Sequence, residues 1–401
     1  MLEVESEVTR QIVAKLELEL SPSERSRLDR PPTGNLQAYD SFLRAERAAR
    51  SGRQDQLRDA LSLYARATEL DPNFAKAFAA HARTAADVWA KDYDDALPAP
   101  VARQQAFEMA SRAVRLDPDA PLPYAVLAVL QVGDRQYEEA IVSARRAVAL
   151  GPSDVDAHAA LGLVLTAAGE HAESVRAVDD ALRLDPNPAT GDSVNAGLAY
   201  SLDGRHERAI EVLGEARAAA PLVEFVNLFL GVAYARDGRI DEARAAAAEA
   251  LRLVPINSIE LQRIVFAHFR DERDLAAVLD AMRAAGFPQW PFGVHGDDME
   301  RLSGAEISRL ALGRTWQGRT ELGEPAFFQI GQDGRSAFRT PSKIETGIVF
   351  VARDMLCDQS DSALLGRPRC GPVFHQKDST GGGSTYTYVN AQKVLHFSPV
   401  N

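Results

Sequence analysis

Residues 116–152 read LDPDAPLPYAVLAVLQVGDRQYEEAIVSARRAVALGP, and the next 34 residues repeat this pattern and end at Leu184-Asp-Pro186. Proline ends an α-helix because it lacks a backbone N–H and disfavours the helical conformation of the residue before it. Apolar residues at helical spacing fill the space between the prolines. Each unit therefore predicts two short helices that are closed by a proline.

The same proline recurs along the middle of the chain. It occurs at Pro72, Pro118, Pro152, Pro186, Pro221 and Pro255, which are 46, 34, 34, 35 and 34 residues apart. A period of about 34 residues is typical of tetratricopeptide repeats, each of which is a pair of antiparallel helices. The chain resembles this repeat family, and we expect an α-solenoid of about six repeats plus a cap.

Small side chains recur where the two helices of a pair should cross. The first helices carry Ala128, Gly162, Gly197 and Gly231 at equivalent positions. A small residue allows the helix axes to approach closely, as tetratricopeptide repeats require. The unit ending at Pro118 has about twelve extra residues near 91–101, and the stretch 258–287 is a degenerate closing repeat.

The sequence changes in character after Pro288. Short strand patterns alternate with turn residues at 314–320, 326–330, 336–340, 347–352, 372–376, 385–389 and 394–398. Seven or so short strands indicate a small antiparallel barrel or sandwich. We therefore predict four parts: an N-terminal helical junction segment (1–34), the solenoid (35–288), a helical connector (289–313) and a small β domain (314–401).

Charge is distributed unevenly along the chain. The formal net charge is -12, and residues 289–401 contain equal numbers of acidic and basic side chains, so the excess lies in the helical part. An acidic solenoid without basic clusters argues against nucleic acid and anionic membranes as partners. No apolar run is long enough for a membrane helix, and residues 1–20 lack the composition of a signal peptide. We expect no direct membrane insertion.

The N-terminal segment carries a second resemblance. Residues 7–16 (EVTRQIVAKL), 20–25 (LSPSER) and 32–44 (PTGNLQAYDSFLR) resemble a junction in bacterial multidomain signalling proteins. In that group a class III adenylate/guanylate cyclase domain or a winged-helix domain comes first, then a TolB-like domain, then tetratricopeptide repeats. The resemblance implies that this chain is a piece of such a protein. No cyclase motif is present, so we expect no catalytic residues, no cofactor and no metal.

Both cysteines, Cys357 and Cys370, fall in the β domain. A disulfide between them would stabilise the domain by roughly 3 kcal/mol, and the alternative is two buried or unpaired thiols. Free thiols would indicate the cytoplasm. A bridge, with a membrane anchor preceding Met1, would indicate the periplasm.

The first helices also predict a binding groove. We expect a line of apolar side chains along its floor, flanked by further apolar residues, with these members: Val129, Leu163, Leu198, Val232, Phe266, Leu228, Phe229 and Phe269. An exposed line of this length implies a bound protein or peptide segment, either from another protein or intramolecular, from residues 1–20 or 290–312. The alternative is that these residues only stiffen the superhelix.

The function expected from the sequence is a non-enzymatic interaction and sensory region of a bacterial signalling protein. One alternative is a small-ligand sensor, in which Trp316, Tyr386, Tyr388 and His396 line a cup at the mouth of the β domain. An enzyme is a further alternative, although no nucleophile, base and orienting acid stand out in the sequence.

Overall fold

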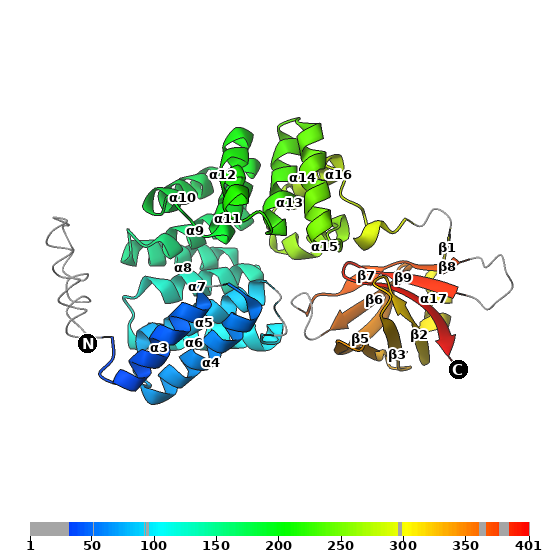
Figure 1. The fold of residues 1–401 in the computed structure, drawn as a ribbon, viewed down its shortest axis with the longest axis horizontal. Helices are drawn as coiled ribbons and strands as arrows, with labels where there is room; N and C mark the ends of the chain where they lie inside the picture. The colour runs from blue at the N-terminus through cyan, green and yellow to red at the C-terminus, as the bar shows by residue number, and fades with distance from the viewer. Residues whose placement is uncertain are drawn as a thin grey trace.

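The computed structural model describes residues 32–50, 52–91, 93, 96–295, 299–360, 366–376 and 385–400. Nearly all of the predicted junction segment, 1–34, lies outside these residues. Figure 1 shows a helical solenoid, coloured blue to green, followed by a β domain coloured from yellow to red.

The solenoid consists of successive antiparallel helix pairs. Their bounds are α3 (Leu36–Ala49) with α4 (Gln54–Leu70), α5 (Ala75–Ala90) with α6 (Ala99–Leu116), α7 (Pro121–Gly133) with α8 (Tyr137–Leu150), α9 (Val155–Ala168) with α10 (His171–Leu184), α11 (Thr190–Leu202) with α12 (His206–Ala219), α13 (Glu224–Arg236) with α14 (Ile240–Leu253), and α15 (Ile259–Val265) with α16 (Glu272–Ala284). A 3₁₀ turn, η1 (Phe266–His268), separates α15 from α16, and a second, η2 (Pro291–Gly293), follows α16. The prediction of an α-solenoid of about six repeats plus a closing unit is confirmed.

The periodic prolines end the second helix of each pair, as predicted. Asp71, Asp117 and Asp185 each precede a proline and adopt extended backbone angles, with φ of -139°, -141° and -126°. The ring of the following proline disfavours the helical conformation at these positions. The helix boundaries therefore follow directly from the Asp-Pro pairs.

Small residues allow the helices of a pair to cross closely. A Cβ added to Gly162 would lie 2.6 Å from Cγ1 of Val178, and one added to Gly197 would lie 2.5 Å from Cγ of Leu213. First helices also contact one another from pair to pair, as α5 does with α7 and α7 with α9. The first helices therefore form the inner layer of the solenoid.

The C-terminal part is one antiparallel sheet with a short helix. Its elements are β1 (Glu300–Arg301), α17 (Gly304–Ala311), β2 (Arg314–Thr320), β3 (Pro325–Ile330), β4 (Arg335–Arg339), β5 (Ile344–Ala352), β6 (Met355–Ser360), β7 (Arg369–Gly371), β8 (Val373–Gln376), β9 (Thr385–Val389) and β10 (Val394–Val400). The strand order is β1-β8-β9-β10-β2-β3-β4-β5-β6-β7. Among the residues that the structure describes, the outermost strands, β1 and β7, do not pair, so the sheet is not closed into a barrel.

The sheet nevertheless curls around its own core. Only Pro372 separates β7, which pairs with β6, from β8, which pairs with β9. Gly371 permits the bend, since a Cβ there would lie 1.7 Å from the carbonyl oxygen of Val389. Aromatic side chains fill the interior, among them Trp316 and Phe397, whose rings stack with centroids 3.8 Å apart.

The segment predicted as a helical connector, 289–313, belongs largely to the sheet. Its β1 pairs with β8, and α17 packs Ile307 and Ala311 into the core of the sheet. A capping box between Ser303 and Glu306 fixes the first turn of α17. Trp290, Phe292 and Val294 also pack against the sheet.

Candidate functional site

The predicted apolar line lies on the first helices, but most of it is covered. Only Val129 and Leu163 are half-buried. The other members are buried, with exposed fractions between 0% and 7%: Leu198, Val232, Phe266, Leu228, Phe229 and Phe269. The downstream part of the line therefore belongs to the core of the solenoid.

Side chains from the last helix pair, α15 with α16, cover part of this line. Phe266 packs edge-on against Phe229, with ring centroids 5.7 Å apart, and stacks obliquely on Phe269 at 5.2 Å. We call residues 265–271, between α15 and α16, the closing turn. Its aromatic side chains lie over α13 and join the same hydrophobic cluster as Val232.

The closing turn also contacts repeats much earlier in the sequence. Arg135 Nη1 donates to the Ala267 carbonyl at 2.7 Å, and the Tyr137 hydroxyl donates to the His268 carbonyl at 2.8 Å. The Arg270 backbone N–H donates to the Ala167 carbonyl at 2.8 Å. Burial lowers the pKa of His268 to about 4. The last repeat therefore reaches back to the turns of the α7–α8 and α9–α10 pairs.

Of the two segments predicted to fill the groove, the structure describes only residues 290–295 and 299–312. Residues 1–20 lie outside the described part of the chain. In that second segment, Trp290, Phe292 and Val294 pack against a cluster of the sheet that consists of Phe374, Val389 and Val394. The prediction that 290–312 fills the groove is wrong, because its apolar residues are used by the β domain.

A charged network lies on the first helices of the upstream repeats. Arg83 of α5 donates to Asp156 of α9 at 3.0 Å and lies 4.0 Å from Glu46 of α3. Glu46 also accepts from the Tyr64 hydroxyl at 2.6 Å. The side chains of Arg83 and Asp156 are 36% and 47% exposed, so the network is open to solvent.

Two further carboxylates lie near this network. Enclosure by the surrounding protein raises the pKa of Asp192 to about 6, and the charges of Asp156 and Asp87 raise it further. Enclosure also raises the pKa of Asp87. Asp192 forms no hydrogen bond or ion pair through its carboxylate with any residue that the structure describes. We call Glu46, Asp87, Asp156 and Asp192, with Arg83 among them, the acidic face.

Sequence reasoning missed the acidic face, although the repeat register contained its signal. Arg83 lies 11 residues after Pro72, as Val129 does after Pro118 and Leu163 after Pro152. Arg83 is therefore the upstream continuation of the predicted line. Extending the repeat alignment by one unit would have placed a charge at the position of the apolar residues.

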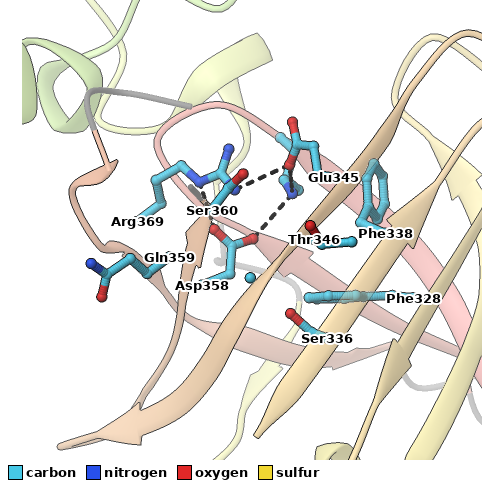
Figure 2. A pocket seen from close by; sticks show the side chains of 11 residues that line it. Phe328, Ser336, Phe338, Glu345, Thr346, Asp358, Gln359, Ser360 and Arg369 are labelled. Carbon is cyan, nitrogen blue, oxygen red and sulfur yellow. Dashed lines mark hydrogen bonds and ion pairs between the residues drawn. The ribbon is translucent and has the colours of Figure 1, made fainter. Parts of the chain in front are cut away.

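The β domain contains a second charged cluster, which is buried (Figure 2). Arg369 donates to Asp358 at 2.6 Å and to Glu345 at 3.1 Å, and all three side chains are at most 8% exposed. Lys393 lies 2.9 Å from the Glu345 carboxylate and 3.1 Å from that of Asp358, and it stands over the Phe338 ring, 4.2 Å from its centroid. Burial alone would raise the pKa of Glu345, but the charges of Lys393 and Arg369 hold this pKa well below its usual range.

This buried cluster is not a ligand cavity. The recess that it lines has a volume of about 10 Å³, which is room for about one water molecule. Each charge already has an opposite partner inside the sheet. The cluster joins β5, β6, β7 and the β9–β10 turn, so its role is structural.

The aromatic cup predicted for the β domain does not assemble. Trp316 and Tyr388 are fully buried in the core. His396 instead lies between Thr387 and Glu321, at 2.9 Å from the Thr387 hydroxyl and 2.8 Å from the Glu321 carboxylate. Thr387 is 0% exposed, so no substrate could reach this hydroxyl. Among the described residues, no three His, Cys, Asp or Glu side chains are grouped to hold a metal ion.

The two cysteines form a disulfide in the structure. Cys357 of β6 lies opposite Cys370 of β7 in the antiparallel register, and their sulfurs are 2.06 Å apart. The bridge thus ties the short edge strand β7 to the sheet. In the part of the chain that is described, no helix is both long enough and apolar enough to cross a membrane.

Comparison with known proteins supports the repeat assignment. A family model described as "Tetratricopeptide repeat" matches residues 126–188 and 194–257. No curated protein matches the chain. Residues 126–188 and 194–257 therefore carry tetratricopeptide repeats.

The chain is also similar, at low identity, to parts of several solved structures. YrrB, described as a tetratricopeptide repeat protein with an unusual peptide-binding site, is 18% identical over 51% of this chain and 96% of its own, with a TM-score of 0.34. TTC0263, a thermophilic tetratricopeptide repeat protein of Thermus thermophilus, is 22% identical over 46% of this chain and 93% of its own, with a TM-score of 0.35. The Cut9–Hcn1 structure is 15% identical over 70% of this chain and 52% of that chain, with a TM-score of 0.44.

Proposed function

We propose that this chain is a non-enzymatic protein-interaction region whose acidic face binds a basic segment of a partner protein. A tetratricopeptide solenoid is a scaffold for protein–protein interaction, and its inner layer of first helices offers a continuous concave surface. The chemistry of that surface decides which partner it fits.

The observation that carries the proposal is the excess of carboxylates on the acidic face. Arg83 pairs with Asp156 and lies 4.0 Å from Glu46, while the charges of Asp156 and Asp87 act on Asp192. Asp192 forms no ion pair within the described part of the chain, although burial disfavours its charged form and only the more distant charge of Arg83 acts against this. A lysine or arginine from a partner would satisfy it and would relieve the repulsion among the carboxylates.

The half-buried Val129 and Leu163 lie on the same inner layer, one helix pair and two helix pairs after Arg83. They offer apolar contact beside the carboxylates. A segment that alternates basic with small apolar residues would match both features. The buried members of the predicted line would then serve the superhelix, and not the partner.

The test is peptide binding to the full chain, followed by fluorescence anisotropy. The probe is a fluorescein-labelled peptide of alternating arginine and alanine, and the comparison is its glutamate–alanine counterpart. We expect only the basic peptide to bind, more weakly at high salt, and to lose about tenfold in affinity in the Asp156→Asn, Asp192→Asn double variant. Asp241→Asn, on the outer helix α14 with a 98% exposed side chain, is the matched control.

Two results would contradict the proposal. One is equal binding of the acidic and basic peptides. The other is a loss of affinity in Asp241→Asn as large as that in the double variant, because the interaction would then depend on overall charge and not on the acidic face.

The wider context is also a proposal. The resemblance of residues 7–44 to the junction of bacterial signalling proteins supports a place beside a cyclase-like or DNA-binding output domain. Helix α15 and the β domain also meet, since Arg367 donates to the Ile264 carbonyl and Ala391 packs on Leu261. Within such a protein, these contacts would join the β domain to the last repeat.

A further inference from the structure

Strand β5 has its polarity reversed. In a half-exposed antiparallel strand, apolar residues face the core and polar residues face water. In β5, however, Glu345 is 7% exposed, whereas Ile344 and Ile348 are 68% and 55% exposed. Phe350 on the same strand is 37% exposed. The strand thus buries its only charge and presents large apolar side chains to solvent.

The buried cluster fixes this arrangement. A shift of β5 by one residue would turn Ile344 and Ile348 inward and Glu345 outward. Glu345 is held in place by Arg369 and Lys393, which also hold Asp358 of the neighbouring strand. Removing one partner from such a cluster leaves a buried charge without compensation. The buried ion pairs of Glu345 therefore keep Ile344 and Ile348 exposed to water, although burying these two side chains would be favourable.

Neighbouring strands extend the apolar surface and add positive charge. The register places Arg339 of β4 directly between Phe327 of β3 and Ile344 of β5. It also places Arg335 opposite Ile348. We call this surface the outer β3–β5 face, and its exposed members are Phe327, Arg335, Arg339, Ile344, Ile348 and Phe350.

The outer β3–β5 face is basic. The exposed residues of β3, β4 and β5 include two arginines and no acid, although the whole chain has a net charge of -12. Arg335 lies 3.6 Å from Asp333 in the adjoining turn. Arg339, in contrast, has no ion pair or side-chain hydrogen bond with any residue in the described part of the chain. An unpaired cation thus stands between two exposed apolar side chains.

We propose that the outer β3–β5 face is a second interaction surface, which binds a protein segment that alternates carboxylates with apolar side chains. Carboxylates of the partner would pair with Arg339 and Arg335, and its apolar residues would cover Ile344, Ile348 and Phe327. The register alternates Arg339 and Arg335 with exposed apolar side chains on the neighbouring strands, so a segment with carboxylates and apolar residues at the same spacing matches both features of the face. The chemistry of the face therefore favours an acidic polypeptide.

The experiment uses the full chain and a fluorescein-labelled peptide of alternating glutamate and valine. A lysine–valine peptide, an oligothymidylate and phosphatidylserine vesicles are tested in parallel. We expect the acidic peptide to bind, and expect Arg339→Glu and Ile348→Asp each to weaken binding about tenfold. Ile344→Thr is a milder change that keeps the β-branched side chain, and it should weaken binding by a smaller factor.

Matched controls lie on the same domain but away from the face. Arg309→Glu makes the same change of charge on the exposed side of α17, and Leu322→Asp makes the same change of polarity in the β2–β3 turn, where the side chain is 75% exposed. Neither control should weaken binding. Circular dichroism at equal concentration verifies that each variant is folded.

Each other outcome overturns the proposal. Failure of the acidic peptide to bind at about 1 mM would show that the face recognises no such segment. Binding of the oligonucleotide or the vesicles, lost in Arg339→Glu, would assign the face to another class of partner. A dimer that dissociates in Ile348→Asp and does not bind the peptide would assign it to a second copy of this chain.

Discussion

Arg83 and Asp156 pair at 3.0 Å although 73 residues separate them, because the helices α5 and α9 that carry them both belong to the inner layer of the solenoid. Helix α7 lies between these two helices in the repeat order and contacts both. One cation thus neutralises part of the acidic face that successive repeats supply.

Removing this cation should strengthen the proposed interaction. In Arg83→Ala, Asp156 and Glu46 lose their cation and are free to pair with the peptide. An exposed ion pair contributes up to about 1 kcal/mol, so we expect the affinity for the arginine–alanine peptide to rise about threefold. Fluorescence anisotropy measures the change. If the affinity falls instead, Arg83 contacts the peptide, and the account of the acidic face would be wrong.

Acidification should loosen the closing turn. The pKa of His268 is about 4 in the folded chain and about 6.5 when the chain is unfolded, so the unfolded state binds more protons between these values. Stability of the turn is therefore full above about pH 6.5 and is lost as the pH falls towards 4, with a loss of about 2 kcal/mol at pH 5. Hydrogen exchange of residues 264–274 at pH 7.5 and 5, corrected for intrinsic rates, measures the effect.

A matched variant separates the histidine from general acid effects. His268→Asn carries no titratable ring and should show nearly equal protection at the two pH values. The prediction would be contradicted by a loss of protection at pH 5 that is the same in the variant and in the natural chain.

The β domain should lose stability at lower pH than the closing turn. Lys393 and Arg369 hold the pKa of Glu345 below its usual value, so its contribution to stability is present above the unfolded pKa of about 4.3 and is lost as the pH falls below it. Denaturant unfolding between pH 6 and 3, followed by tryptophan fluorescence, should show this decrease. In Glu345→Gln the domain should be less stable at pH 6, and its stability should change less with pH. An unchanged slope would show that the cluster does not titrate as proposed.

Reduction of the disulfide should affect one domain only. Cys357 and Cys370 are 13 residues apart, and a bridge across a loop of this size contributes roughly 3 kcal/mol. We expect dithiothreitol, or the Cys357→Ser, Cys370→Ser variant, to lower the unfolding midpoint of the β domain and to leave the helical transition of the solenoid nearly unchanged. Titration of two free thiols in protein that was made under oxidising conditions would contradict the bridge.

The helical fold was predictable because its signals are local and repeated. A proline after Asp71, Asp117 or Asp185 ends a helix regardless of tertiary context, and the glycines at the crossings report a contact within one repeat. Most strands of the β domain were predictable too, since turn residues separate them. Strands β1, β6 and β7 were missed because two of them are very short and β6 mixes Cys357 and Asp358 with apolar residues.

The candidate sites were harder to predict because they depend on contacts between distant residues. Arg83 meets Asp156 only through the curvature of the superhelix, and Glu345 meets Arg369 only through the curl of the sheet. The packing of Phe266 on Phe229 likewise depends on how the last repeat turns back. A single sequence gives the period of a repeat, but not the angle between successive repeats.

The most direct test of the acidic face is the pH dependence of its binding to the arginine–alanine peptide. Asp192 has a pKa of about 6, so it is mainly protonated at pH 5 and mainly charged at pH 7. We predict an affinity about fivefold higher at pH 7 than at pH 5 in the natural chain, and a clearly smaller difference in Asp192→Asn. Equal affinities at the two pH values in the natural chain, or the same pH dependence in Asp192→Asn, would contradict the claim that this carboxylate receives a basic partner.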